Sequence, residues 1–377
     1  MKCFGRTSLS EILQDRVVYR NLAPADSRLP TLEQLRDALG FPANYIPRKN
    51  QPEYAAALAP ILEHARKLDA PNAIVKRLIC IGDTRMNDGA AFTNLCRAGG
   101  WKGLAFIASE TKDTENLDVI EQEHGILILT NRWGAMSAFE SFRREQKFPI
   151  DEQTIIIMDL DKTLLGARGR NDHVIDAARV AAVRRTVGDL LGDQFDPEGF
   201  QAAYDRLNQP EFHPFTTDNQ DYLAYICLIV GSGLLDITSL VDALRSGSLS
   251  SFERWINVVD QRAAELPAHL QKIHNKVVAL VRQGDPTPFK DFRRQEYQTT
   301  IEHMGRLEDH APVSAMLQGE IVITQEVREI ALAWRDQGAL LFGVSDKPDE
   351  ASIPSDALAA QGYQAIHKVE THAVGGE

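Results

Sequence analysis

The chain has 377 residues, of which 44% are hydrophobic and 25% charged, as expected for a soluble globular protein with two domains or one large one. Its formal net charge of −12 argues against a nucleic-acid-binding surface, because phosphate backbones are bound by lysine and arginine. A small anionic substrate is still compatible with this charge, since a metal ion and a few local cations can reverse the field inside one pocket.

The sequence contains four cysteines, at Cys3, Cys80, Cys96 and Cys227. None of them forms a CxxC pair, which argues against a zinc site and suits a reducing compartment. Residues 1–13 lack a basic segment followed by an apolar one, so we expect no signal peptide. The longest apolar stretch, 223–235, contains glycines and is too short to span a bilayer. The sequence therefore predicts a cytoplasmic protein without a membrane partner.

The first predicted elements are two helices. Residues 31–39 have a helical pattern that ends at Gly40, a residue suited to the left-handed cap of a helix. A second helix is predicted over 54–68, directly after a Pro-Glu pair. Lys49 stands three residues before that proline, so we expect it in the loop that leads into the helix.

Strands and helices then alternate along the chain. The apolar run 78–81 predicts a strand, and Asp83 follows it after one glycine. Asp88 comes after four more residues, and a helix is predicted over 90–98 with a further strand over 103–108. This alternation is typical of a parallel sheet covered by helices, so the fold class predicted is α/β.

The most informative stretch begins with the apolar run 154–158, which predicts a buried parallel strand. Asp159 and Asp161 follow it and lie on the same side of the backbone if the strand continues, with Thr163 on the turn beyond. Open α/β sheets carry their chemistry at the carboxyl ends of strands, so two carboxylates and a hydroxyl are expected there. Arg168 comes soon after, within reach of an anionic substrate.

Beyond residue 165 the pattern becomes helical. Helices are expected at 174–191, 198–207, 221–230, 237–244, 252–265, 268–282 and 296–307. Lys290, Arg293 and Arg294 form a basic cluster there, which is either a substrate-anion site or an exposed helix face. This α-rich insert has the usual size of a separate domain.

Alternation resumes with a helix over 325–336 and a strand over 339–344 that closes on Ser345. The tail, 372–377, is expected to fray. The predicted organisation is a sheet-forming core built from two separated segments, with a helical insert between them. The three segments are 1–165, 166–335 and 336–377.

Four of these features resemble the motifs of one family. The strand 154–158 with its Asp-x-Asp-x-Thr sequence resembles motif one of the haloacid dehalogenase (HAD) superfamily, most of whose members are Mg²⁺-dependent phosphatases. The Gly-Asp sequence at Asp83, with Asp88 beyond it, resembles the acidic motif four. Lys49 before Pro-Glu and a helix looks like motif three. Ser345 at a strand end, followed by Asp-Lys-Pro, resembles motif two.

The motifs stand in the order three, four, one, two, whereas the family order is one, two, three, four. We infer a circular permutation, which leaves the packing intact when the original termini lie close together. The resemblance covers roughly 1–165 and 336–377, and it implies a Rossmann-like parallel sheet with an inserted α-helical cap. One alternative stays open, because the strand pattern 126–129 closes on Thr130 and also fits motif two. Ser345 is preferred because the long insert separates it from motif one, where many family members carry the cap.

The resemblance also implies a mechanism. The Asp159 carboxylate, the backbone carbonyl of Asp161 and Asp83 would hold Mg²⁺, with Asp88 in support. Asp159 would attack phosphorus, and Asp161 would act as general acid and base. Lys49 and Ser345 would then bind the phosphoryl oxygens.

Thr163 and Arg168 are further substrate-binding candidates, and the substrate expected is a small phosphorylated metabolite.

Simpler interpretations exist for several of the candidate site residues. Asp83 is of a type that often caps a following helix, Lys49 alone resembles a solvated surface lysine, and Ser345 resembles a turn residue. Two rival functions use the same sequence: a phosphotransferase or mutase, and a binding or regulatory protein without catalysis.

Overall fold

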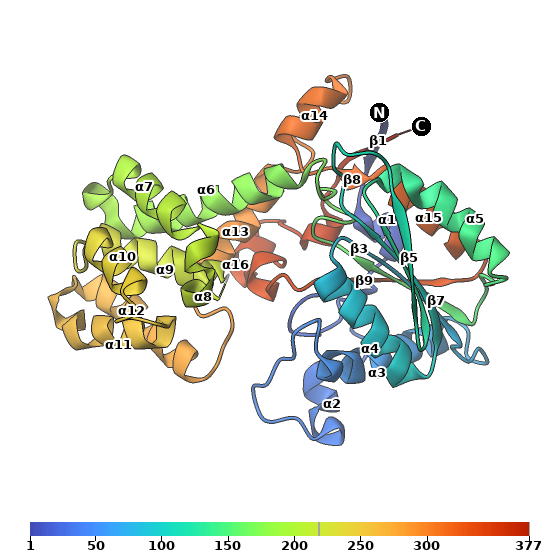
Figure 1. Cartoon of the computed structure of the whole chain (residues 1–377), viewed down its shortest axis with the longest axis horizontal. Coiled ribbons are helices and arrows are strands. Elements are labelled where there is room, and N and C mark those ends of the chain that lie inside the picture. Colours follow the sequence, from blue (N-terminus) through green and yellow to red (C-terminus); the bar gives the residue numbers. More distant parts are fainter. Residues whose placement is uncertain (218, 377) are drawn as a thin grey trace. The chain divides into compact units, whose positions relative to one another are not determined.

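The computed structural model describes residues 1–217 and 219–376 (Figure 1). The chain forms two compact units, Met1–Ala177 with Thr300–Glu377, and Ala178–Thr299. The insert is therefore shorter than the predicted 166–335. Its expected ends belong to the first unit instead. The region after residue 300 supplies a strand, β8 (Ile323–Thr324), that pairs with the C-terminal strand of that unit.

The first unit contains a seven-stranded sheet, which confirms the predicted α/β class. In spatial order its strands are β2 (Val17–Val18), β9 (Leu340–Val344), β7 (Thr154–Asp159), β3 (Arg77–Gly82), β4 (Lys102–Ala108), β6 (Gly125–Thr130) and β5 (Leu117–Gln122). Neighbouring strands are parallel except for the β5–β6 pair. The interior strand β7 is fully buried, as its β-branched apolar sequence predicts.

Helices cover both faces of this sheet (Figure 1). On one face, α3 (Pro52–Asp69) and α4 (Ala90–Gly99) pack on side chains such as Ile155 and Ile157. On the other face lie α5 (Met136–Glu145) and α15 (Gln325–Arg335), whose rings Phe139 and Trp334 are 6.1 Å apart between centroids. Both faces of the strands are thus buried, and only the edges and ends of the sheet are left for function.

Shorter helices complete the first unit. They are α1 (Leu9–Leu13), α2 (Leu32–Leu39), α14 (Val313–Gly319) and α16 (Asp356–Ala359). The predicted helix at 31–39 is present as α2, with Thr31 and Gln34 in a capping box at its start. Gly40 ends it at φ +68°, the left-handed conformation that favours glycine.

A second, three-stranded sheet joins the two ends of the chain. Its strands are β1 (Lys2–Thr7), β10 (Thr371–Gly375) and β8 (Ile323–Thr324), and β10 lies in the middle. The expectation that 372–377 frays is therefore wrong for its described residues, while Glu377 lies outside them. The reason is that β10 has a partner on each side, and all five of its residues are buried.

The second unit is helical, as predicted. Its helices, two of which begin or end in the first unit, are α6 (Asp172–Leu191), α7 (Pro197–Leu207), α8 (His213–Thr216), α9 (Gln220–Gly231), α10 (Ile237–Arg245), α11 (Phe252–Arg262), α12 (Ala268–Arg282) and α13 (Lys290–Glu302). They pack around an aromatic core that includes Tyr225, Phe252 and Trp255. Among the described residues of the chain, no helix is both long and apolar enough to cross a membrane.

Deleting the C-terminal strand tests its structural role. A chain that ends at Glu370 should lose at least about 3 kcal/mol of unfolding free energy, because buried apolar side chains including Val374 are removed. Urea denaturation measures this loss, with a chain that lacks only Glu377 as control. Equal midpoints for the two chains would show that β10 contributes nothing to the fold.

Candidate functional site

Three of the predicted site residues emerge at the carboxyl edge of the main sheet. β7 lies between β9 and β3, and in register Asp159 is opposite Val344 while Met158 is opposite Ile81. Ser345 directly follows Val344, and Asp83 comes two residues after Ile81. Parallel strands thus bring these side chains from distant parts of the sequence to one edge.

Three carboxylates gather at this edge. Asp83, Asp88 and Asp159 each place one oxygen within 4.8 Å of the others, and all three side chains are buried. Asp88 reaches the group because a π-helical turn, Arg85–Gly89, follows β3. A Cβ atom on Gly82 would lie 2.4 Å from the Cβ of Asp88, so the glycine before Asp83 allows this close approach.

Asp88 has both of its carboxylate oxygens engaged. Oδ2 accepts hydrogen bonds from the backbone N–H groups of Asp83 at 3.1 Å and Thr84 at 2.8 Å. Oδ1 accepts one from Lys49 Nζ at 2.6 Å. Burial raises the pKa of Asp88, but Lys49 and these bonds lower it more, so the net pKa is below the usual range. An ionised carboxylate held in this way suits a supporting role.

Lys49 links two members of the triad. Its Nζ donates to both Asp88 and Asp159, and the residue is only 3% exposed. The reading of Lys49 as a solvated surface lysine is therefore wrong. Burial lowers the pKa of Lys49, but the two carboxylates raise it more, so the ammonium stays charged.

The carboxylates at this edge outnumber the cationic side chains that pair with them. Arg168 Nε donates to Asp83 Oδ2, so two cations, Lys49 and Arg168, face three aspartates. Burial, followed by the nearby Asp88, raises the pKa of Asp83 to about 7 although Arg168 opposes the shift. Burial likewise raises the pKa of Asp159 well above its usual range. Buried carboxylate oxygens in excess of their counter-charges fit a hard divalent cation.

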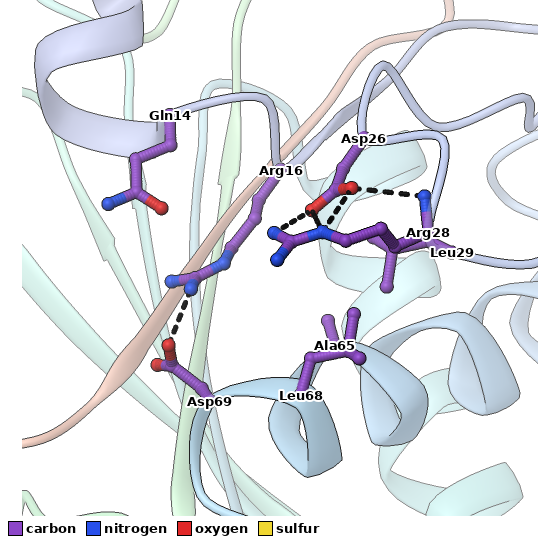
Figure 2. Close-up of a pocket in the computed structure, with 8 residues that line it drawn as sticks. All are labelled: Gln14, Arg16, Asp26, Arg28, Leu29, Ala65, Leu68 and Asp69. Atoms are coloured by element: carbon purple, nitrogen blue, oxygen red, sulfur yellow. Dashed lines mark hydrogen bonds and ion pairs between the residues drawn. The ribbon is translucent and has the colours of Figure 1, made fainter.

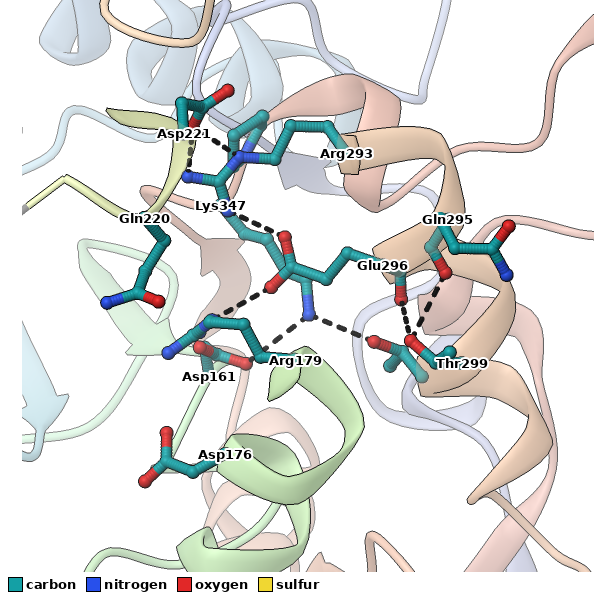
Figure 3. A network of polar contacts seen from close by, with 12 residues as sticks. Asp161, Asp176, Arg179, Gln220, Asp221, Arg293, Gln295, Glu296, Thr299 and Lys347 are labelled. Atoms are coloured by element: carbon teal, nitrogen blue, oxygen red, sulfur yellow. Dashed lines mark hydrogen bonds and ion pairs between the residues drawn. The ribbon is translucent and has the colours of Figure 1, made fainter. Parts of the chain in front are cut away.

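Asp161 adds no carboxylate to the triad, and its expected metal contact through the backbone carbonyl stays a prediction. Its Oδ1 lies 3.9 Å from Nζ of Lys347 (Figure 3). The same ammonium group donates to Thr300 Oγ1 at 3.2 Å. Sequence reasoning overlooked Lys347 as a site residue. The signal was present, because Lys347 belongs to the Asp-Lys-Pro sequence that follows Ser345.

The strand order bears on the two motif-two candidates. Thr130 ends β6, which is separated from β7 by β3 and β4, and its hydroxyl donates to the carbonyl of Asn116. Ser345 follows β9, the direct neighbour of β7, which favours Ser345. Its Oγ accepts a hydrogen bond from Lys347 N at 3.1 Å, so it also forms the turn that the simpler reading expects.

Thr163 and Arg168 differ from expectation. Thr163 is 0% exposed, and its hydroxyl has no partner among the described residues, so a substrate in solution does not reach it in this conformation. Arg168 lies in the site, and its guanidinium is paired with Asp83 although 34% of its side chain is exposed. A substrate anion would have to compete with that carboxylate.

Two buried polar residues near this edge were missed from the sequence. Arg20 Nη1 donates to Asp346 Oδ1 at 3.0 Å, while its Nε and Nη2 have no partner among the described residues. The Tyr54 hydroxyl is also buried without a partner there, and burial raises its pKa. Arg20 follows a two-residue strand, β2, which is too short to give a recognisable sequence pattern.

The basic cluster of the helical unit is internally neutralised. Arg293 is buried between Asp221 and Glu296, with a 2.6 Å bond to Glu296 Oε2 (Figure 3). Lys290 and Arg294 also pair with aspartates. The cluster is therefore a poor anion site, and the exposed-face reading is wrong for Arg293.

No protein-family model, curated protein or solved structure matches this chain. The HAD resemblance consequently rests on the four motifs.

Replacing Lys49 tests its structural contribution. Lys49→Met should lower the unfolding free energy by about 3 kcal/mol at neutral pH, because the buried Asp88 and Asp159 lose their shared cation. The double variant Lys49→Met/Asp159→Asn should recover part of the loss. Chemical denaturation measures both, with the exposed Lys67→Met as control; no difference between Lys49→Met and this control would contradict the assignment.

Proposed function

We propose that the chain is a Mg²⁺-dependent phosphatase of the HAD type, circularly permuted, that hydrolyses a small phosphomonoester. The observation that supports this most is the convergence at one sheet edge of Lys49, Asp83, Asp88 and Asp159, with Ser345 following the adjacent strand. These positions correspond to all four motifs of the resemblance. A circular permutation changes the order of the motifs in the chain but keeps their spatial arrangement, so the four motifs are expected to lie together.

In this proposal Asp159 and Asp83 hold Mg²⁺, and Asp88 supports them while keeping Lys49 in place. When bound, the ion neutralises the carboxylates and the phosphate, which would otherwise repel each other. Arg168, which pairs with Asp83 in the metal-free protein, would be available to the substrate when Asp83 holds the ion instead. The excess of buried carboxylate in the site supports this role.

The chain's own residues supply the covalent chemistry. An oxygen of Asp159 forms a bond to phosphorus while the bond from phosphorus to the ester oxygen breaks, and Asp161 gives its proton to the leaving alkoxide. A water molecule then attacks the aspartyl-phosphate, Asp161 takes the proton from that water, and inorganic phosphate leaves. Lys49 and Ser345 bind the phosphoryl oxygens, where negative charge is concentrated. Lys347, close to Asp161, helps to hold that carboxylate in position.

The helical unit, Ala178–Thr299, is proposed to act as the cap that selects the substrate. Its place in the sequence supports this, because it is inserted between the strand of Asp159 and the strand of Ser345. A cap that closes over a phosphatase site excludes bulk water and contacts the part of the substrate that is not transferred. A phosphotransferase would use the same core, and it would differ only in passing the phosphoryl group to an added alcohol.

The catalytic assignment is tested by phosphate release in the presence of Mg²⁺. Asp159→Asn should reduce release to background with every substrate, because the nucleophile is lost. Asp161→Asn should lose about 10²–10⁴-fold with an alkyl phosphate, and less with p-nitrophenyl phosphate, whose leaving group needs little protonation. Asp118→Asn, an exposed aspartate on β5, is the matched control. Equal release by wild type and Asp159→Asn would refute the proposal.

Metal binding should depend on pH with a definite sign. The pKa of Asp83 in the metal-free protein is about 7, so below this pH the folded protein carries a proton that Mg²⁺ must displace. Apparent Mg²⁺ affinity should therefore fall by at least about tenfold per pH unit below pH 7, because Asp83, and also Asp159 with its raised pKa, must lose a proton to bind the ion. Titration calorimetry between pH 5.5 and 8.5 measures this, and Asp83→Asn should bind weakly throughout. A flat profile in the wild type would contradict the proposed ligand role of Asp83.

A further inference from the structure

A pocket in the first unit lies at the amino-terminal edge of the main sheet. It is lined by residues at the starts of β3 and β4 and by the loop that follows α5, and its volume is about 530 Å³. Small-molecule sites commonly fall in the range of about 300–1,000 Å³. Asp83 follows the opposite end of β3, so this pocket is separate from the candidate active site.

The lining of this pocket is strongly basic. Four cationic side chains line it, at Lys76, Arg77, Lys102 and Lys147, and none of its lining residues carries a carboxylate. Arg77 already donates to Asp151, at 2.5 Å. Across residues 1–217 and 219–376, no carboxylate forms an ion pair with any of the three lysines, and all three are exposed. Unpaired positive charge is thus concentrated in one hollow of a chain whose net charge is −12.

Another pocket of the same unit shows the contrast (Figure 2). It has a volume of about 220 Å³ and contains two arginines. Arg16 pairs with Asp69 at 2.6 Å, and Arg28 pairs with Asp26 at 2.7 Å. Because both of these cations are matched within the pocket, an incoming anion would have to displace a carboxylate. The pocket lined by Lys76, Lys102 and Lys147, called the lysine pocket below, requires no such displacement.

The backbone of the lysine pocket is held by hydrogen bonds. Lys102 N donates to the carbonyl of Lys76 at 3.1 Å, which fixes the starts of two neighbouring strands. Lys147 adopts a left-handed backbone at φ +52°, unusual for a residue other than glycine, and its N donates to the carbonyl of Arg144 at 2.9 Å. The three ammonium groups therefore project from fixed points of attachment, although each side chain is itself flexible.

Part of the pocket wall is apolar. Val75, Phe148 and Pro149 line it, and Phe148 N bonds to the carbonyl of Arg143 at 3.1 Å, which anchors the loop. Three uncompensated ammonium groups suit an anion with several charges, because lysine acts as a point charge toward phosphate. The apolar side chains suit a ring or other water-excluding body attached to that anion.

We propose that this lysine pocket binds a small organic polyphosphate, in which a chain of phosphates meets the lysines and an aromatic body meets Phe148, Val75 and Pro149. A nucleoside triphosphate has this chemistry. The proposal does not depend on the proposed phosphatase activity, because none of the residues that carry it belongs to the triad or contacts it.

Titration calorimetry with ATP in EDTA tests the proposal on the full-length chain. Lys76→Gln/Lys102→Gln/Lys147→Gln should weaken ATP binding at least about tenfold relative to wild type. The corresponding triple change to arginine should retain binding. A matched control, Lys67→Gln/Lys112→Gln/Lys272→Gln, removes the same charge from exposed lysines elsewhere and should bind as wild type does.

Two further measurements locate the site and its chemistry. Asp159→Asn should bind ATP with unchanged affinity, which separates this pocket from the candidate active site whether or not the chain is a phosphatase. Pyrophosphate should bind more weakly than ATP, and adenosine more weakly still. Absence of ATP binding to wild type, equal affinities for the two glutamine triples, or a loss of binding in Asp159→Asn would overturn the proposal.

Discussion

The rest of the structure depends on a concentration of negative charge that one lysine holds in place. Asp88 and Asp159 are buried, and both accept hydrogen bonds from Lys49, while Asp83 is paired with Arg168. A buried charge is costly unless it is paired, so these contacts determine which loops meet at the carboxyl edge of the sheet. The same burial raises the pKa values of Asp83 and Asp159, and the oxygens of the three carboxylates lie close enough together that they could hold a metal ion.

Much of the fold could be predicted because its signals are local. The apolar run that became β7, the helix α2 with its Gly40 cap and the helices of the second unit all depend on neighbouring residues. The order of strands in the sheet is not local. Parallel pairing joins Val17 to Gly343 and Ile155 to Leu340, and only the structure places β9 beside β7 and separates β6 from it.

In the candidate site, too, the sequence identified residues by local patterns but did not reveal their burial or their partners. Asp83, Asp88, Asp159 and Lys49 were identified from their spacing and from the family resemblance, and the structure brings them together. Burial could not be predicted for Thr163, whose side chain reaches no solvent. The tail was assigned by its terminal position, but a strand with partners on both sides is among the most protected parts of a sheet. Charge pairing with residues distant in sequence could not be predicted either, as in the helical unit, where Asp221 pairs with Arg293.

The central claim is that four distant segments form one metal-assisted phosphoryl-transfer site, and diffraction from crystals grown with Mn²⁺ and beryllium fluoride tests it directly. Mn²⁺ replaces Mg²⁺ and gives an anomalous signal, while beryllium fluoride mimics a phosphoryl group on a carboxylate. The account predicts one anomalous peak between Asp83 and Asp159, with the fluoride complex on Asp159 facing Lys49 and Ser345. A peak elsewhere with this triad empty, or a fluoride complex on another carboxylate, would contradict it.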